Sequence, residues 1–104
     1  MMKSAFVAIS SVGPNGDPTK GAREQPFWAE HEAFIDRLVD EGFILMGGPL
    51  LDQNGLPHGA LLIVNAQHEN EVKEKLKRDP WFERGILKLE SISRWEIFVD
   101  AGTR

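Results

Sequence analysis

Two residues far apart in the chain, His31 and Asp79, have side chains that are well suited to proton transfer. His31 follows Phe27 by four positions and precedes Phe34 by three, which puts it on the apolar side of a predicted helix. A buried histidine beside a carboxylate works as a general acid or base near neutral pH. The plainer interpretation, which helix position alone favours, is a core histidine bonded to a backbone carbonyl.

Asp79 precedes Pro80, and an aspartate in front of a proline most often caps the start of a helix. No local pattern places Asp79 next to His31, because the two lie in different predicted helices. If both helices cover the same face of a sheet, however, an inward-facing His31 and an Asp79 at the end of the second helix are able to meet.

The other candidates carry weaker signals. The chain has no cysteine, which excludes disulfides, thiolate metal sites and a cysteine nucleophile. Neither His58 nor His68 has the spacing of a helical metal site, so we predict no metal and no cofactor. Gly47-Gly48-Pro49 lacks the lysine and the strand-to-helix context of a phosphate loop, and we interpret it as a tight bend after a strand.

Composition narrows the class of protein. A chain of 104 residues, 41% hydrophobic and 27% charged, fits one globular domain, which we place over residues 1–104. The net charge is −4 and the basic residues are scattered, so we predict no nucleic acid partner. The first apolar stretch, residues 5–9, is too short for a signal peptide or a membrane span. We therefore expect a cytoplasmic protein that does not bind membranes.

The periodicity of apolar residues predicts the elements that must position His31 and Asp79. They are a strand over 4–11, a turn-rich loop over 12–23, a helix from Pro26 to a left-handed Gly42, strands over 43–47 and 59–65 joined around Asn54-Gly55, a helix over 69–78, a new turn at Asp79-Pro80, and a strand over 87–99. This order is the ferredoxin-like βαββαβ pattern. It predicts an α+β fold with a four-stranded antiparallel sheet and two helices on one face.

Both faces of this predicted sheet are apolar. The last strand places Leu89, Trp95, Ile97 and Val99 on one side, and the two middle strands are apolar on both sides. An open antiparallel sheet with one wet face should alternate between apolar and polar residues. Two short helices cover only one face, so we predict a homodimer that packs sheet against sheet. The rival interpretation, that the spare face lines a ligand pocket, is compatible with it.

Four segments, HEAFIDRLVDEG, FILMGGPL, KLKRDPWFERGIL and SRWEIF, resemble the YCII-related domain family over nearly the whole chain. The most specific parts are His31, Gly47-Gly48-Pro49, and Asp79-Pro80 followed by an aromatic residue and Gly85. The resemblance implies dimeric α+β barrels of ferredoxin-like fold and an enzymatic activity around a His–Asp pair, here His31 and Asp79. One branch of the family is associated with dehydrochlorination of an aromatic ring-degradation intermediate.

The function that we expect is general acid/base proton transfer on a small cyclic organic substrate, in a lyase, dehydrochlorinase or isomerase. Asp79 would orient His31, and the two side chains should lie within ~3.2 Å beside a cavity. Phe27, Trp28, Met46, Gly48 and Trp81 are the residues expected to bind the substrate. The alternative is a non-catalytic metabolite-binding or accessory dimeric domain. Cofactor-free oxygenation is a third possibility, which no residue specifically favours.

Overall fold

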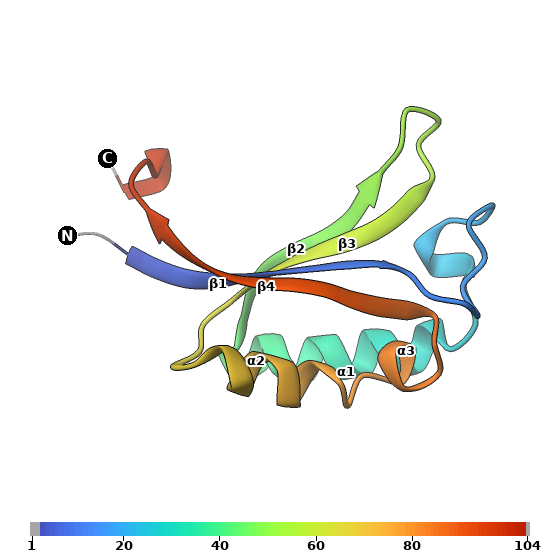
Figure 1. The fold of residues 1–104 in the computed structure, drawn as a ribbon, viewed down its shortest axis with the longest axis horizontal. Coiled ribbons are helices and arrows are strands. Elements are labelled where there is room, and N and C mark those ends of the chain that lie inside the picture. The colour runs from blue at the N-terminus through green and yellow to red at the C-terminus, as the bar shows by residue number, and fades with distance from the viewer. Residues whose placement is uncertain (1–2, 104) are drawn as a thin grey trace.

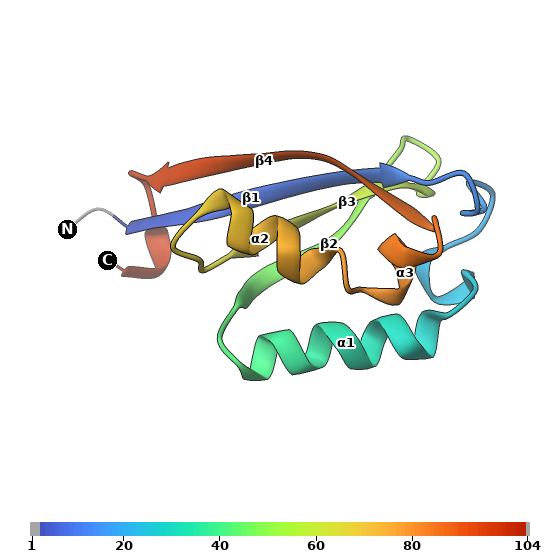
Figure 2. The ribbon, with the colours of Figure 1, turned by 60° about the horizontal axis from the view of Figure 1, so that its bottom comes forward.

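The computed structural model describes residues 3–103 as a four-stranded antiparallel sheet with its α-helices on one face (Figures 1 and 2). The elements are β1 (Lys3–Val12), η1 (Ala22–Glu24), α1 (Trp28–Asp40), β2 (Ile44–Leu51), β3 (Pro57–Val64), α2 (Glu69–Leu76), α3 (Pro80–Glu83), β4 (Leu87–Ile97) and η2 (Ala101–Thr103). The strand order is β2-β3-β1-β4, and every neighbouring pair is antiparallel. The predicted ferredoxin-like α+β fold is confirmed.

The core lies between the sheet and the helices. Alternate residues of a strand point to the same face, and Phe6 and Ala8 of β1 point to the helix side together with Val64 of β3. The helices complete the core with Phe34, Leu38, Val72 and Leu76. The two predicted anchors of the second helix, Val72 and Leu76, are 0% and 1% exposed, so this mostly polar helix is held to the sheet by them.

Three local predictions about chain ends and turns are confirmed. Gly42 ends α1 in the left-handed region with φ of 79°, and Gly55 adopts φ of 80° in the turn between β2 and β3. Asp79 caps α3, because its side chain accepts a hydrogen bond of 2.9 Å from the backbone amide of Trp81. Glycine is favoured at such positive φ values because it has no Cβ.

The predicted start of the first helix is wrong by two residues. Pro26 was expected inside the first turn, but α1 begins at Trp28 and its N-cap, Phe27, has φ of 63°. A non-glycine residue in this region is uncommon. Next to this bend, the carbonyl of Pro26 accepts a hydrogen bond of 2.8 Å from the indole nitrogen of Trp81.

The predicted bend at Gly47-Gly48-Pro49 is also wrong. These residues lie inside β2, where they pair with Leu62, Leu61 and Ala60 of β3. Proline is tolerated here because β2 is an edge strand. A Cβ on Gly47 would overlap the side chain of Leu62 and the carbonyl of Leu61, so glycine allows the two strands to approach.

The prediction for the faces of the last strand needs a correction as well. Ile9 pairs with Ser91 and Ser10 pairs with Leu89, so the ladder skips Glu90 in an irregularity of the bulge type. The skip brings Leu89 and Ile92 to the core side, although strict alternation would separate them. β4 ends at Ile97, and α2 ends two residues before its predicted end.

The face of the sheet that is turned away from the α-helices carries a row of apolar side chains. Figures 1 and 2 show α1, α2 and α3 together on the opposite face. By the strand register, the residues of this free face are Ala5, Val7, Ile9, Leu61, Ile63, Trp95 and Ile97. Trp95 is 40% exposed, Val7, Ile9, Leu61 and Ile97 are half-buried, and Ala5 and Ile63 are buried. Among residues 3–103, no helix has the length and apolar character needed to cross a membrane.

Candidate active site

A cavity of about 480 Å³ lies between α1 and the sheet. One side of α1 lines it with Trp28, His31, Ile35 and Val39, which follow the helical spacing of three and four residues. The neighbouring side of the same helix enters the core through Phe34 and Leu38. The broad apolar face that the sequence predicted is therefore divided, because one half packs in the core and the other half lines the cavity.

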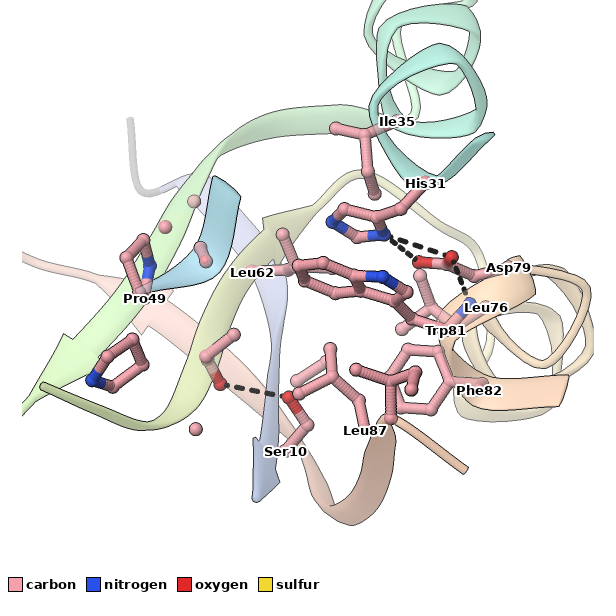
Figure 3. Close-up of a pocket in the computed structure, with 18 of the residues that line it drawn as sticks. Ser10, His31, Ile35, Pro49, Leu62, Leu76, Asp79, Trp81, Phe82 and Leu87 are labelled. Atoms are coloured by element: carbon pink, nitrogen blue, oxygen red, sulfur yellow. Dashed lines mark hydrogen bonds and ion pairs between the residues drawn. The ribbon is translucent and has the colours of Figure 1, made fainter. Parts of the chain in front are cut away.

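His31 and Asp79 meet at the wall of this cavity (Figure 3). Nδ1 of His31 lies 2.8 Å from Oδ2 and 3.0 Å from Oδ1 of Asp79, within the distance expected for the pair. The side chain of Asp79 is 1% exposed and that of His31 is 14% exposed. The pair is thus shielded from bulk water, and its histidine is the member that remains accessible from the cavity.

The arrangement around Asp79 determines which nitrogen of His31 is free. Oδ1 of Asp79 also accepts the backbone amide of Trp81, so the carboxylate serves as an acceptor for two neighbours. An ionised carboxylate can only accept hydrogen bonds, and Nδ1 must then carry the proton. Nε2 has no partner among the described residues, and Figure 3 shows this nitrogen on the side of the ring turned away from Asp79. Its lone pair is available to a ligand.

The indole of Trp81 packs against one face of the His31 ring. The two rings are stacked with centroids 3.7 Å apart and planes 6° apart. The indole nitrogen of Trp81 donates to the carbonyl of Pro26 at 2.8 Å, which fixes the indole in its plane. Trp28 completes the cluster at 5.8 Å from the ring of His31. His31 is therefore positioned through its edge by a carboxylate and through its face by an aromatic ring.

The turn-rich segment after β1 closes one end of the cavity through Ala22 and Gln25. The side chain of Gln25 binds this segment together, because it accepts from the backbone amide of Asp17 at 2.9 Å and donates to the carbonyl of Asp17 at 2.7 Å. The side-chain and backbone hydrogen bonds from Thr19 keep the pKa of Asp17 below its ordinary value. The carboxylate of Asp17 is therefore ionised at neutral pH and accepts from the backbone amide and the hydroxyl of Thr19.

Four of the five residues expected to bind substrate line the cavity, namely Trp28, Met46, Gly48 and Trp81. Phe27 does not line it. Its ring lies 4.2 Å from the guanidinium carbon of Arg84, in a separate surface hollow. Phe27 lies outside α1, as its N-cap, and its backbone is in the left-handed region.

Sequence reasoning missed Ser10 and Leu62 as lining residues of the cavity. Both belong to strands and face the helices, as the pairing of Ala8 with Leu62 and of Ser10 with Ala60 requires. Ser10 carried a usable signal, since it is the polar member of an otherwise apolar inward row in β1. Among the residues that the structure describes, no three histidine or acidic side chains come together as metal ligands.

The chain is similar to known proteins in sequence and in fold. A sequence model of the YCII-related domain matches residues 6–96. A solved structure with a TM-score of 0.64 and 24% identity is the 5-chloro-2-hydroxyhydroquinone dehydrochlorinase of Burkholderia phenoliruptrix, in complex with 2,5-dihydroxybenzoquinone. The superposition covers 86% of this chain and 92% of that one, and at this identity it supports the fold. A search of curated proteins gave no match.

Proposed function

Because this chain belongs to the YCII-related domain family, we propose that it is an enzyme in which the His31–Asp79 pair moves a proton on a small cyclic organic substrate. The observation that carries the proposal is the hydrogen bond of 2.8 Å between Nδ1 of His31 and Asp79, at the wall of a cavity with the volume of a small-molecule site. Elimination, including dehydrochlorination, and isomerisation are the reactions that such a pair supports.

In this mechanism, Nε2 of His31 accepts a proton from the substrate while Nδ1 keeps its hydrogen bond to Asp79. The positive charge that develops on the imidazole is stabilised by the carboxylate, which already lies within 3.0 Å. In an isomerisation, His31 returns the proton to another atom of the substrate. In a dehydrochlorination, the electron pair released by the substrate expels chloride, so that one proton and one chloride ion leave.

The walls of the cavity favour this chemistry. Trp28, Leu62 and Trp81 supply apolar surface around His31 and limit the water that reaches it. In such surroundings the interaction between an imidazolium and a carboxylate is stronger than in water. The solved dehydrochlorinase of similar fold acts on a chlorinated hydroquinone, which makes this compound class a reasonable first substrate.

The test is chloride release from 5-chloro-2-hydroxyhydroquinone by the purified protein and its variants. We expect His31→Gln and Asp79→Asn to lower kcat by about a hundredfold or more, which is the usual contribution of a general base. His58→Gln is the matched control, because His58 is exposed and lies outside the cavity. Circular dichroism and size-exclusion chromatography check that each variant is folded.

The outcomes separate the two candidate functions. Turnover that survives in folded His31→Gln contradicts the proposal. Binding of ring compounds to the wild type without turnover of any chlorinated or isomerisable ring favours the alternative, a metabolite-binding or accessory domain. A loss of folding in His31→Gln alone, with Asp79→Asn intact and active, points to a structural histidine instead.

We further propose that residues 1–104 form one domain and that two copies pack through the free sheet face, in the cytoplasm. The support for the dimer is the apolar row on the side without α-helices, in particular the half-buried Val7, Ile9 and Leu61 with the partly exposed Trp95. A two-fold axis makes such a surface self-complementary. The support for the cytoplasm is the absence of cysteine from the sequence.

A further inference from the structure

Ser10 offers a second polar contact inside the cavity, on the wall opposite His31. His31 comes from α1 in the helix layer and Ser10 comes from β1 in the sheet layer (Figure 3). We infer that the cavity takes an uncharged ring compound with two oxygen substituents, one meeting Nε2 of His31 and the other bound by the hydroxyl of Ser10. This inference rests on the proposed function and specifies the substrate class of the same site.

Ser10 is free to bind a ligand because its present hydrogen bond is weak. The hydroxyl oxygen lies 3.5 Å from the carbonyl oxygen of Ala60, whereas O–H···O hydrogen bonds are usually 2.5–3.0 Å long. Ser10 is 8% exposed, so little bulk water reaches the hydroxyl. A buried hydroxyl without a good partner gains stability when a ligand supplies one.

The other polar side chains along the inner wall already have partners. Gln25 donates to the carbonyls of Asp17 and Lys20 and accepts from the amide of Asp17. Asp79 accepts from Trp81 and is bonded to His31. Two groups therefore remain in the interior for hydrogen bonds to a ligand, and they are Nε2 of His31 and the hydroxyl of Ser10.

The charges around the cavity favour an uncharged ligand. The carboxylates that line it are Asp79, which is paired with His31, and Glu32 and Asp36, which are exposed along the α1 side of the opening. None of the described lining residues is a lysine or an arginine. A carboxylate or phosphate on the ligand would meet this negative potential without a cation to balance it.

The shape is consistent with a single ring. A volume of about 480 Å³ lies within the range of small-molecule sites. The rings of Trp28 and Trp81 lie 5.7 Å apart at the His31 end, where they present aromatic surface to a flat compound. Leu62 and Leu87 also line the cavity and give apolar walls that fit the carbon skeleton of a ring.

The experiment measures the binding of three matched probes by NMR titration of the labelled protein under argon. Hydroquinone has two uncharged hydroxyls, phenol has one, and 4-hydroxybenzoate replaces one hydroxyl by a carboxylate. The variants are Ser10→Ala and, as control, Ser11→Ala. Ser11 is the next residue of β1, points to the other face and bonds Glu90 at 2.6 Å.

We expect the wild type to bind hydroquinone about tenfold more tightly than phenol, which corresponds to one additional hydrogen bond. Ser10→Ala should bind hydroquinone as weakly as phenol and leave the affinity for phenol unchanged. Ser11→Ala should behave like the wild type. Equal affinity of Ser10→Ala and wild type for hydroquinone overturns the inference, and so does a failure of all three probes to bind.

A second arm tests the charge selection. The wild type should bind 4-hydroxybenzoate at least about tenfold more weakly than hydroquinone, and the double variant Glu32→Gln with Asp36→Asn should reduce this difference. The control removes the carboxylates of Glu30 and Asp40, which are exposed on α1 and outside the cavity. Equal binding of 4-hydroxybenzoate and hydroquinone by the wild type contradicts the inference. Both arms measure binding and not turnover. Their outcome can therefore be interpreted whether or not His31→Gln loses activity.

Discussion

His31 is held on two sides by residues of one short segment, Asp79 to Trp81. The carboxylate of Asp79 binds the edge of the imidazole, and the indole of Trp81 lies flat against its face at 3.7 Å. The same aspartate caps α3 through the amide of Trp81. Capping and orientation of the histidine are therefore one arrangement, so a change at Asp79 affects both.

Trp81 is predicted to act as a positioning residue for His31. Trp81→Phe keeps an aromatic ring beneath the imidazole but removes the hydrogen bond to the carbonyl of Pro26. We expect kcat for chloride release to fall about tenfold or more while KM changes little, because small misplacements of a base slow proton transfer. The control is Trp95→Phe on the free face of the sheet. A higher KM with unchanged kcat would mean instead that Trp81 only contacts the substrate.

At the residue scale, the sequence predicts the members of the site better than their contacts. Helix position and the place before Pro80 made His31 and Asp79 candidates, and the resemblance to the YCII-related domain family paired them. The stack with Trp81 was not predictable, because the indole is held by the carbonyl of Pro26, which lies far from Trp81 in the chain. Such contacts follow from tertiary structure, which local spacing does not contain.

The elements that carry the site are attached to the sheet by few side chains. α2 is mostly polar and enters the core through Val72 and Leu76, yet α3 and Asp79 follow directly behind it. The place of Asp79 relative to His31 thus depends on the packing of α2. The side chain of Leu76 also lines the cavity.

Leu76→Ala is expected to lower the free energy of unfolding by about 2–5 kcal/mol, since it removes a fully buried side chain and leaves a void. Chemical denaturation followed by circular dichroism measures this change. Lys73→Ala is the control on the same helix, where an exposed side chain should contribute within about 0.5 kcal/mol. Equal effects of the two substitutions would mean that α2 does not hold the sheet as described.

Gly42→Ala is expected to destabilise the protein by about 1 kcal/mol, although a Cβ at this position meets open space. The reason is the positive φ of 79° that ends α1. Gly48→Ala, also in open space but without a positive φ, is the matched control and should be close to neutral. Thermal unfolding of the two variants compares them, and a larger loss for Gly48→Ala would contradict the backbone argument.

At the element scale, periodicity and turn residues were sufficient for the order of strands and helices. They were insufficient where tertiary pairing overrides them. Gly47-Gly48-Pro49 has the composition of a bend, yet pairing with β3 keeps it in an edge strand. The skip at Glu90 is set by the partner strand β1, so the faces of β4 could not be read from alternation alone.

The whole molecule has a helix side that holds the candidate site and a free sheet face with no α-helix on it (Figure 2). A dimer through this face would leave the cavity accessible, because His31 lies on the opposite side of the sheet. Catalysis and association are therefore expected to respond to different substitutions. The apolar pattern of strands two and three was visible in the sequence, and the packing of a second copy against this face stays a prediction.

Trp95→Lys is expected to weaken the proposed homodimer, because it places a charge on the partly exposed part of the free face. Analytical ultracentrifugation should find a dimer for the wild type and a shift toward monomer for the variant. Ala29→Glu, an exposed change on α1, is the control and should leave the dimer intact. A monomeric wild type at micromolar concentration would contradict the proposed association.

The claim that His31 and Asp79 form a proton-transfer pair is tested most directly by the tautomer of His31. Long-range proton–nitrogen NMR of the imidazole distinguishes its two nitrogens in the neutral ring. The geometry predicts a proton on Nδ1 and a free Nε2 in the wild type, since Nδ1 lies 2.8 Å from Asp79, and a loss of this preference in Asp79→Asn. A neutral His31 with its proton on Nε2, unchanged by Asp79→Asn, would contradict the account.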